Sequence, residues 1–205
     1  ITPDQIYAWS DANKTTPKTS APALADAMEL FRPYAEAGRE IVCFSISAGM
    51  STSGNVMRLA AEELGASDRI KVIDSANLST GIGLLVVEAA IMAKNNRTAS
   101  QIVSEIEKLK PNVRASFVVD TLTYLYRGGR CNAVAAMAGG VLKLHPRIVV
   151  EDSAMNASKK YRGKIASVVM NYVKDMEKDL KKRWNAHKLK KIKIKCFFIR
   201  LHKDV

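Results

Sequence analysis

Cysteine and histidine are scarce in this chain, with three residues of each among 205. The cysteines are Cys43, Cys131 and Cys196, and the histidines are His145, His187 and His202. No two cysteines form a Cys-x-x-Cys pair, which argues against both a disulfide framework and a zinc site. We therefore expect no metal, no cofactor and a reducing cytoplasm as the compartment.

Long apolar runs are also missing. The best candidate, Ile82 to Ala93, is interrupted by Gly83 and Glu88, whereas a membrane-spanning helix needs roughly 20 apolar residues. The first residues contain no basic segment leading into an apolar core, so a secretion signal is not predicted. The chain begins with Ile1 rather than Met, which suggests that its true start is missing. We predict a protein without a membrane span.

Charge is distributed very unevenly. Residues 1–158 hold 16 Lys plus Arg and 16 Asp plus Glu, whereas residues 159–205 hold 16 basic and 4 acidic residues and so account for the whole net charge of +12. A nucleic-acid-binding function would therefore belong to the C-terminal segment alone. We keep that function as an alternative, although nucleic acid is not the partner we favour.

The basic segment has two patterns. Apolar residues at spacings of three and four predict an amphipathic helix over Lys159–Trp184. Lysines then alternate with apolar residues over Lys188–Ile199, which would suit an edge strand. Three interpretations of this tail stay open: a non-native terminus, a solvated edge strand, and an anion-binding tail.

The neutral part of the chain alternates helical and strand patterns. Helices are predicted at Thr2–Asn13, with Thr2 as the capping residue, and at Pro22–Ala37, Asn55–Leu64, Thr80–Lys94 and Thr98–Lys110; strands are predicted at Ile41–Ile46, Arg69–Ile73 and Ala115–Val119. A strand–helix–strand unit of this kind is parallel, and its ligand site lies beyond the strands' carboxyl ends. We expect a first α/β domain over residues 1–111, a partial second α/β domain over 112–184, and a basic tail over 185–205.

Hydroxyl side chains cluster at three places, residues 15–20, 45–54 and 74–80. Hydroxyls beside free backbone N–H groups at a helix start can bind a carboxylate or a phosphate. Such residues also serve simply as helix caps, and that alternative stays open for each cluster. No nucleophile elbow or P-loop is present, and no histidine precedes His145. Catalysis by this chain alone is therefore not predicted.

Four motifs stand out along the chain. They are Thr19-Ser20-Ala21-Pro22, the Ser47–Ser53 loop, Val72-Ile73-Asp74-Ser75, and the run from Phe117 to Leu122 continued by Tyr124-Leu125-Tyr126-Arg127-Gly128-Gly129-Arg130. Together these motifs resemble the DegV family, which includes the fatty-acid-binding subunits of bacterial fatty acid kinase. The resemblance extends in order and spacing from residue 1 to about residue 165. The last of these runs is the most specific.

The resemblance implies a two-domain α/β protein with a mostly parallel sheet in the first domain, which holds a long-chain fatty acid in an apolar tunnel. Ligand-binding roles are implied for Thr19, Ser20, Ser47, Ser51 and Ser53, with Thr19 and Ser51 matching the hydroxyls that the family places on the carboxylate. Arg130 matches the arginine that works with the kinase subunit, which converts the bound acid to an acyl phosphate. The implied role of this chain is binding, not catalysis.

This sequence departs from the family pattern in three places. The family's first strand with its Asp-Ser motif and its late Gly-Thr-His motif have no counterpart, so we expect a central part of the family fold with an incomplete second domain. The family loop usually reads Leu-Ser-Gly-Thr-Tyr, whereas this chain has Met50-Ser51-Thr52-Ser53-Gly54. The serine is kept, but its neighbours differ.

Overall fold

The structure is a computed structural model that describes residues 1–129 and 144–187. The chain divides into two compact units, which we describe separately. Unit 1 comprises Ile1–Ala115 together with Val150–Ala154. Unit 2 comprises the described residues of 116–149 and those from Met155 onward.

The centre of unit 1 is a pair of parallel strands, β1 (Ile41–Ser45) and β2 (Ile70–Asp74). Their register pairs Ile41 with Ile70 and Ser45 with Asp74, so the two strands end side by side. Successive side chains of a strand point to opposite faces of the sheet. Apolar residues occupy both faces, as the continuous apolar runs predict for a strand buried on two sides.

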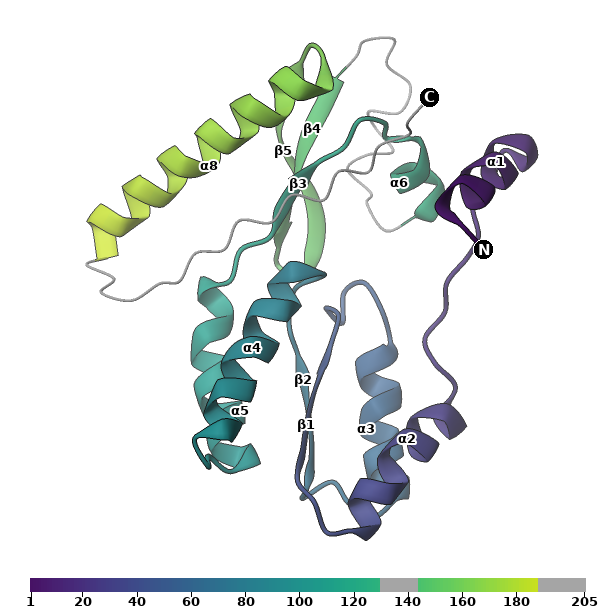
Figure 1. Cartoon of the computed structure of the whole chain (residues 1–205), viewed down its shortest axis with the longest axis vertical. Coiled ribbons are helices and arrows are strands. Elements are labelled where there is room, and N and C mark those ends of the chain that lie inside the picture. The colour runs from purple at the N-terminus through teal and green to yellow at the C-terminus, as the bar shows by residue number, and fades with distance from the viewer. Residues whose placement is uncertain (130–143, 188–205) are drawn as a thin grey trace. The chain divides into compact units, whose positions relative to one another are not determined.

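Helices cover both faces of this sheet (Figure 1). One face packs against α2 (Leu24–Glu36) and α3 (Ser53–Glu63) through a core that includes Phe31, Ala60 and Ile70. The opposite face packs against α4 (Thr80–Lys94) and α5 (Ala99–Leu109) through a core that includes Ile73, Leu85 and Ile106. The predicted α/β class, with a parallel sheet flanked by helices, is confirmed.

Two predicted helix starts are confirmed in atomic detail. Helix α1 (Pro3–Asn13) begins after Thr2, whose side chain accepts from the Gln5 backbone N–H while the Gln5 side chain accepts from the Thr2 backbone N–H. Helix α5 has the same reciprocal arrangement between Thr98 and Gln101. Each capping box satisfies two backbone donors that have no partner inside the helix. A short 3₁₀ turn, η1 (Lys110–Asn112), follows α5.

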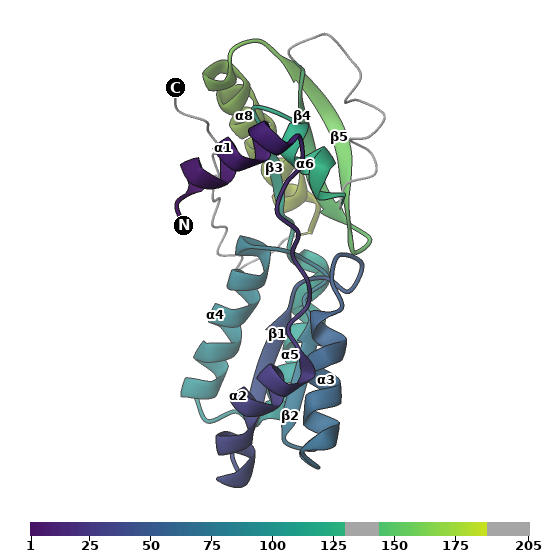
Figure 2. The ribbon, with the colours of Figure 1, turned by 90° about the vertical axis from the view of Figure 1, so that its right-hand side faces the viewer.

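Unit 2 contains a three-stranded sheet in the order β3-β4-β5, formed by β3 (Ser116–Val118), β4 (Leu144–Glu151) and β5 (Ala154–Arg162). Strands β3 and β4 are antiparallel. Helix α6 (Thr123–Gly128) follows β3 and packs on one sheet face, where Leu122 and Leu125 contact Ile148. Helix α8 (Ile165–His187) packs on the other face, where Val168 and Tyr172 contact Val118 and Tyr161. Figure 2 shows helices α6 and α8 on either side of the strands.

The helix predicted over Lys159–Trp184 begins later than expected. Residues 159–162 form the end of β5, and α8 starts at Ile165 after Gly163, whose φ is +120°. The apolar positions of the helical pattern also begin at Ile165. Lys159–Arg162 instead belong to the strand that borders β4, and Tyr161 is buried in the sheet–helix core.

A polar cluster links β5 to α8 beside that core. Lys159 and the Tyr161 hydroxyl both donate to the Asp175 carboxylate, the latter at 2.8 Å. These two bonds lower the pKa of Asp175 below its ordinary value, and the bond from Lys159 has the larger effect. Burial, and then the bond to Asp175, raise the pKa of Tyr161. The Tyr172 hydroxyl donates to the Ser116 backbone carbonyl at 2.7 Å and lies 2.8 Å from the Ser116 hydroxyl.

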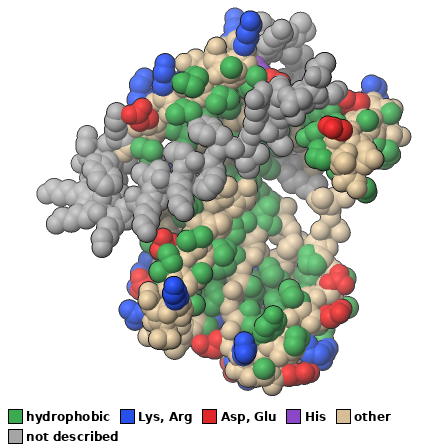
Figure 3. All heavy atoms as spheres, viewed as in Figure 1, with side chains coloured by type: hydrophobic (Ala, Val, Ile, Leu, Met, Phe, Trp, Pro, Cys, Tyr) green, Lys and Arg blue, Asp and Glu red, His purple; other side chains and the backbone are tan. Residues whose placement is uncertain are grey.

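The outward face of α4 is apolar. Val86, Val87 and Ile91 are all more than two-fifths exposed, and Figure 3 shows apolar side chains on the surface of unit 1. Within the described residues, no helix has the length and apolar character needed to cross a membrane.

Three predictions lie outside the described residues. They concern the partner-binding residue Arg130, the edge strand at Lys188–Ile199, and all of the basic tail beyond His187. The predictions for them stand as stated.

We expect Tyr172→Phe to destabilise unit 2 by roughly 1–3 kcal/mol, because the variant loses the bonds between the buried Tyr172 hydroxyl and the half-buried Ser116 groups. Denaturant unfolding of the variant measures the loss. Tyr126→Phe is the matched control, since Tyr126 belongs to the same unit and is 52% exposed. Equal stability of the two variants would contradict the assigned role of the Tyr172 hydroxyl.

Candidate functional site

The candidate site lies where β1 and β2 end. The chain leaves β1 through residues 46–52 before α3, and it leaves β2 through residues 75–79 before α4. Both loops emerge at the same end of the sheet because the strands are parallel and in register (Figure 1). Ligands of open parallel sheets bind at this end.

Ser47 is fully buried and serves the structure of the loop. Its hydroxyl donates to the Ser153 backbone carbonyl at 2.8 Å and accepts from the Gly49 backbone N–H at 3.3 Å. Its own carbonyl accepts from the Met50 and Ser51 backbone N–H groups, which closes a tight turn. A Cβ on Gly49 would lie 2.4 Å from the Ser153 carbonyl oxygen, so only glycine fits there.

Ser51 and Ser53 form a hydroxyl pair at the start of α3. Their Oγ atoms lie 2.8 Å apart, and Ser51 Oγ also accepts from the Ser53 backbone N–H at 3.2 Å. Both side chains are partly exposed. A pair of hydroxyls carries two protons, and only one can lie between the two oxygens. The second proton is therefore available to an acceptor outside the pair, such as a carboxylate.

Gly54, where the family loop usually has tyrosine, is required by Ser45. A Cβ at position 54 would lie 2.7 Å from Ser45 Oγ. Ser45 is 3% exposed, and its hydroxyl has no hydrogen-bond partner among the described residues. A side chain at position 54 would therefore displace the Ser45 hydroxyl.

The loop after β2 is held by polar side chains as well. Asp74 Oδ1 accepts from the Ala76 backbone N–H at 2.9 Å and from the Ala48 backbone N–H at 3.3 Å. Asn77 is buried, and its amide group donates to the Val113 carbonyl at 3.3 Å. A Cβ on Gly81 would lie only 2.1 Å from Asn77 Oδ1. The first turn of α4 can therefore approach this loop only with glycine at position 81.

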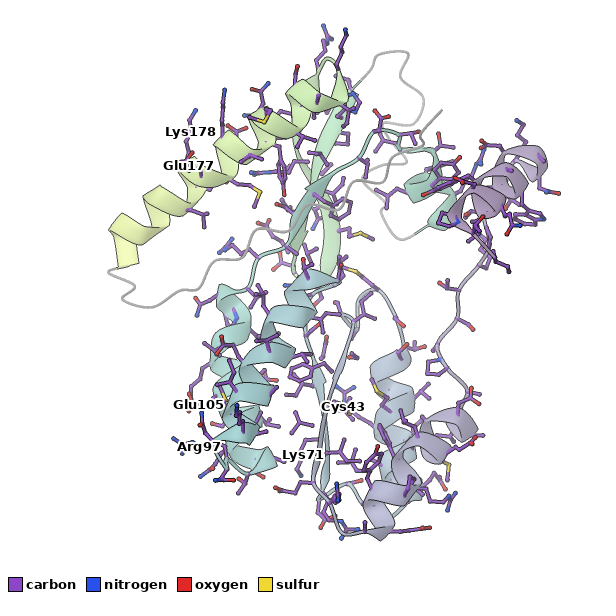
Figure 4. All side chains as sticks on the ribbon, viewed as in Figure 1. Cys43, Lys71, Arg97, Glu105, Glu177 and Lys178 are labelled. Atoms are coloured by element: carbon purple, nitrogen blue, oxygen red, sulfur yellow. The ribbon has the colours of Figure 1, made fainter. Side chains whose placement is uncertain are left out.

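Cys43, two residues before Ser45 on β1, is not a reactive thiol. Burial raises its pKa to about 11, against the smaller opposing effect of the Arg58 charge. Its Sγ lies 3.5 Å from the Lys71 carbonyl oxygen on β2, and Figure 4 labels both residues. In the part of the chain that the structure describes, no three His, Cys, Asp or Glu side chains are grouped as metal ligands.

The structure thus places three of the predicted residues between the end of β1 and the start of α3: Ser47 and Ser51 lie in the loop, and Ser53 is the first residue of α3. Thr19 and Ser20 are exposed on the extended connection between α1 and α2. Sequence reasoning missed Ser45, Asn77 and the bridging role of Asp74. The sequence feature that could have identified them is the presence of polar residues at the ends of two apolar strands and just after them.

The DegV family model, whose members are described as uncharacterised proteins, matches residues 1–191. This chain belongs to the DegV family. A DegV domain-containing protein from Deinococcus radiodurans is 33% identical over 159 residues, which are 78% of this chain and 56% of that protein. Another from Clostridium acetobutylicum is 33% identical over 189 residues, 89% of this chain and 66% of the relative. The chain therefore spans less than two thirds of these relatives.

Solved structures share the fold. A DegV family protein from Thermus thermophilus, described by its fatty acid binding, is 28% identical with a TM-score of 0.68, over 80% of this chain and 57% of that one. A stearic-acid-binding protein from Eubacterium ventriosum is 28% identical with a TM-score of 0.71, over 87% and 64%. DegV from Bacillus subtilis, a fatty acid binding protein, is 26% identical with a TM-score of 0.66, over 87% and 63%.

We expect Ser47→Ala to lower the free energy of unfolding by roughly 1–3 kcal/mol, because it removes a buried donor from the Ser153 carbonyl and an acceptor from the Gly49 N–H. Denaturant unfolding measures the change. Ser104→Ala, on the exposed face of α5, is the control and should leave stability nearly unchanged. A Ser47→Ala protein as stable as this control would show that the buried bonds contribute little.

Proposed function

We propose that this chain binds a long-chain fatty acid and presents its carboxylate to a kinase subunit, which forms an acyl phosphate. The strongest support comes from similar solved structures that are described as fatty acid binding. We place the carboxylate at the Ser51–Ser53 hydroxyl pair, with Thr19 and Ser20 as further candidate donors. The apolar tunnel for the acyl chain belongs to the same proposal.

The hydroxyl pair has suitable chemistry for a carboxylate. An ionised carboxylate only accepts hydrogen bonds, and bonds to a charged acceptor are stronger than neutral ones. Ser51 Oγ accepts from the Ser53 N–H, and a Ser53 hydroxyl that donates to Ser51 fills its remaining acceptor position. In that arrangement the Ser51 proton is available to a ligand, and in the reverse arrangement the Ser53 proton is.

We propose a binding role rather than independent catalysis for this chain, in the cytoplasm. The loop offers neutral hydrogen-bond donors, which suit recognition of an anion. Phosphoryl transfer to the carboxylate oxygen would be the work of the kinase subunit and its nucleotide. Arg130 is the residue that we propose for contact with that subunit, because a guanidinium fork suits an acidic or phosphate-bearing surface.

Solvent extraction of the purified protein, followed by mass spectrometry, tests the proposed function. We expect one acyl chain per protein. Absence of any acyl chain at stoichiometric sensitivity would count against fatty acid binding.

Ser51→Ala should weaken fatty acid binding by roughly 1.5–3 kcal/mol, because a charge-assisted bond is lost. Affinity and melting temperature are measured on the same variant. If Ser51→Ala melts earlier but binds as tightly as the unmodified protein, Ser51 is only a helix cap.

The contact with a kinase has its own test. We expect Arg130→Ala to keep fatty acid affinity and melting temperature while lowering acyl-phosphate formation with the kinase subunit at limiting amounts of this chain. Arg130→Lys is the matched control, because it keeps the charge but loses the planar fork of donors. An unchanged phosphorylation rate in Arg130→Ala would refute the role, and a large loss of stability would assign the residue to folding.

A further inference from the structure

Asp74 joins the two loops of the candidate site through a single oxygen atom. Its Oδ1 accepts from the Ala48 N–H, in the loop after β1, and from the Ala76 N–H, in the loop after β2. Asp74 is also the last residue of β2 and pairs in register with Ser45, the last residue of β1. One side chain thus connects both segments at the point where they leave the sheet.

An acidic residue is unexpected beside hydroxyls that would receive an anion. Among the described residues, no Lys, Arg or His forms an ion pair with Asp74, so no neighbouring cation offsets its charge. A like charge near a bound carboxylate weakens binding rather than strengthening it. Asp74 therefore contributes to this site through the position of its carboxylate oxygen, which accepts hydrogen bonds from two backbone N–H groups.

That geometry bears on Ser51. Ala48 is the second residue of the turn in which the Met50 and Ser51 N–H groups both bond to the Ser47 carbonyl. Ser47 is itself anchored by its hydroxyl to the Ser153 carbonyl, and its N–H donates to the Asn77 carbonyl. Asp74 adds a bond on the next residue, Ala48, which sets the direction of the turn leading to Ser51.

We propose that Asp74 is a positioning residue, which holds the turn so that the Ser51–Ser53 hydroxyl pair faces the ligand. This inference rests on the proposed fatty acid binding. The two bonds need a side chain that is long enough to place an acceptor oxygen beside both N–H groups, and they do not need a charge. Asparagine supplies that oxygen at the same distance from the backbone, whereas alanine does not.

The test compares Asp74→Ala and Asp74→Asn with the unmodified protein, using palmitate as the probe. We expect Asp74→Ala to weaken palmitate binding by roughly tenfold, the usual effect of losing such bonds, and Asp74→Asn to stay within about twofold. Asp68→Ala is the matched control, because Asp68 precedes the opposite end of β2 and its side chain is 72% exposed. If Asp74→Ala does not fold, Asp74→Ser replaces it, since serine is too short to reach both amides.

A second measurement separates this inference from the proposed function. In amide spectra, the signals of Ala48 and Ala76 should shift upfield in Asp74→Ala and stay near their original positions in Asp74→Asn. Unmodified affinity in Asp74→Ala would overturn the proposal, and so would an equal loss in Asp74→Asn. If the unmodified protein and Asp68→Ala both fail to bind palmitate, the proposed function fails. Unmoved Ala48 and Ala76 signals would then also overturn the bridging role of Asp74.

Discussion

The parallel pairing of β1 and β2 is the constraint on which unit 1 depends. Its register places Ser45 directly beside Asp74, so both strands end at one edge and both following loops start from there. The pairing also places both faces of the sheet under helices, which explains why apolar residues occupy both faces of β1 and β2. A shift of one residue would turn each core side chain to the other face.

Where the chain leaves the parallel sheet, its backbone N–H and C=O groups lose their strand partners and need others. The residues at this edge supply those partners. The Ser47 N–H donates to the Asn77 carbonyl, and the Ser75 N–H donates to the Ser45 carbonyl, so the two loops bond to each other. Ser47 thus serves the fold through its hydroxyl and its backbone N–H. The Ser51–Ser53 pair is the part of this edge that we propose for a ligand.

Unit 2 uses a different arrangement, in which helices pack on both faces of a sheet that includes antiparallel pairing. The Tyr172 hydroxyl reaches across to Ser116 on β3, and Asp175 receives donors from β5. These contacts join residues far apart in the sequence. Apolar contact between Val168 and Val118 holds α8 against the strands, and these directional polar contacts also fix its position along them.

The sequence alone determined the elements whose signals are local. The continuous apolar run of β1, the helix starts at Thr2 and Thr98, and the family motifs were all readable because each depends on neighbouring residues. It also placed Ser47, Ser51 and Ser53 in one loop. The start of α8 was missed because no apolar spacing in Lys159–Arg162 marks a boundary, and their strand conformation comes from pairing with β4, which the local pattern does not show.

The tertiary structure alone decided which hydroxyls are available. Ser47 and Ser51 are equivalent in sequence, yet Ser47 is buried against the Ser153 carbonyl, more than a hundred positions along the chain. Asp74 and Ala48 meet only because two strands pair in one register. Contacts at long sequence separation carry no local pattern, since their geometry comes from how whole elements pack.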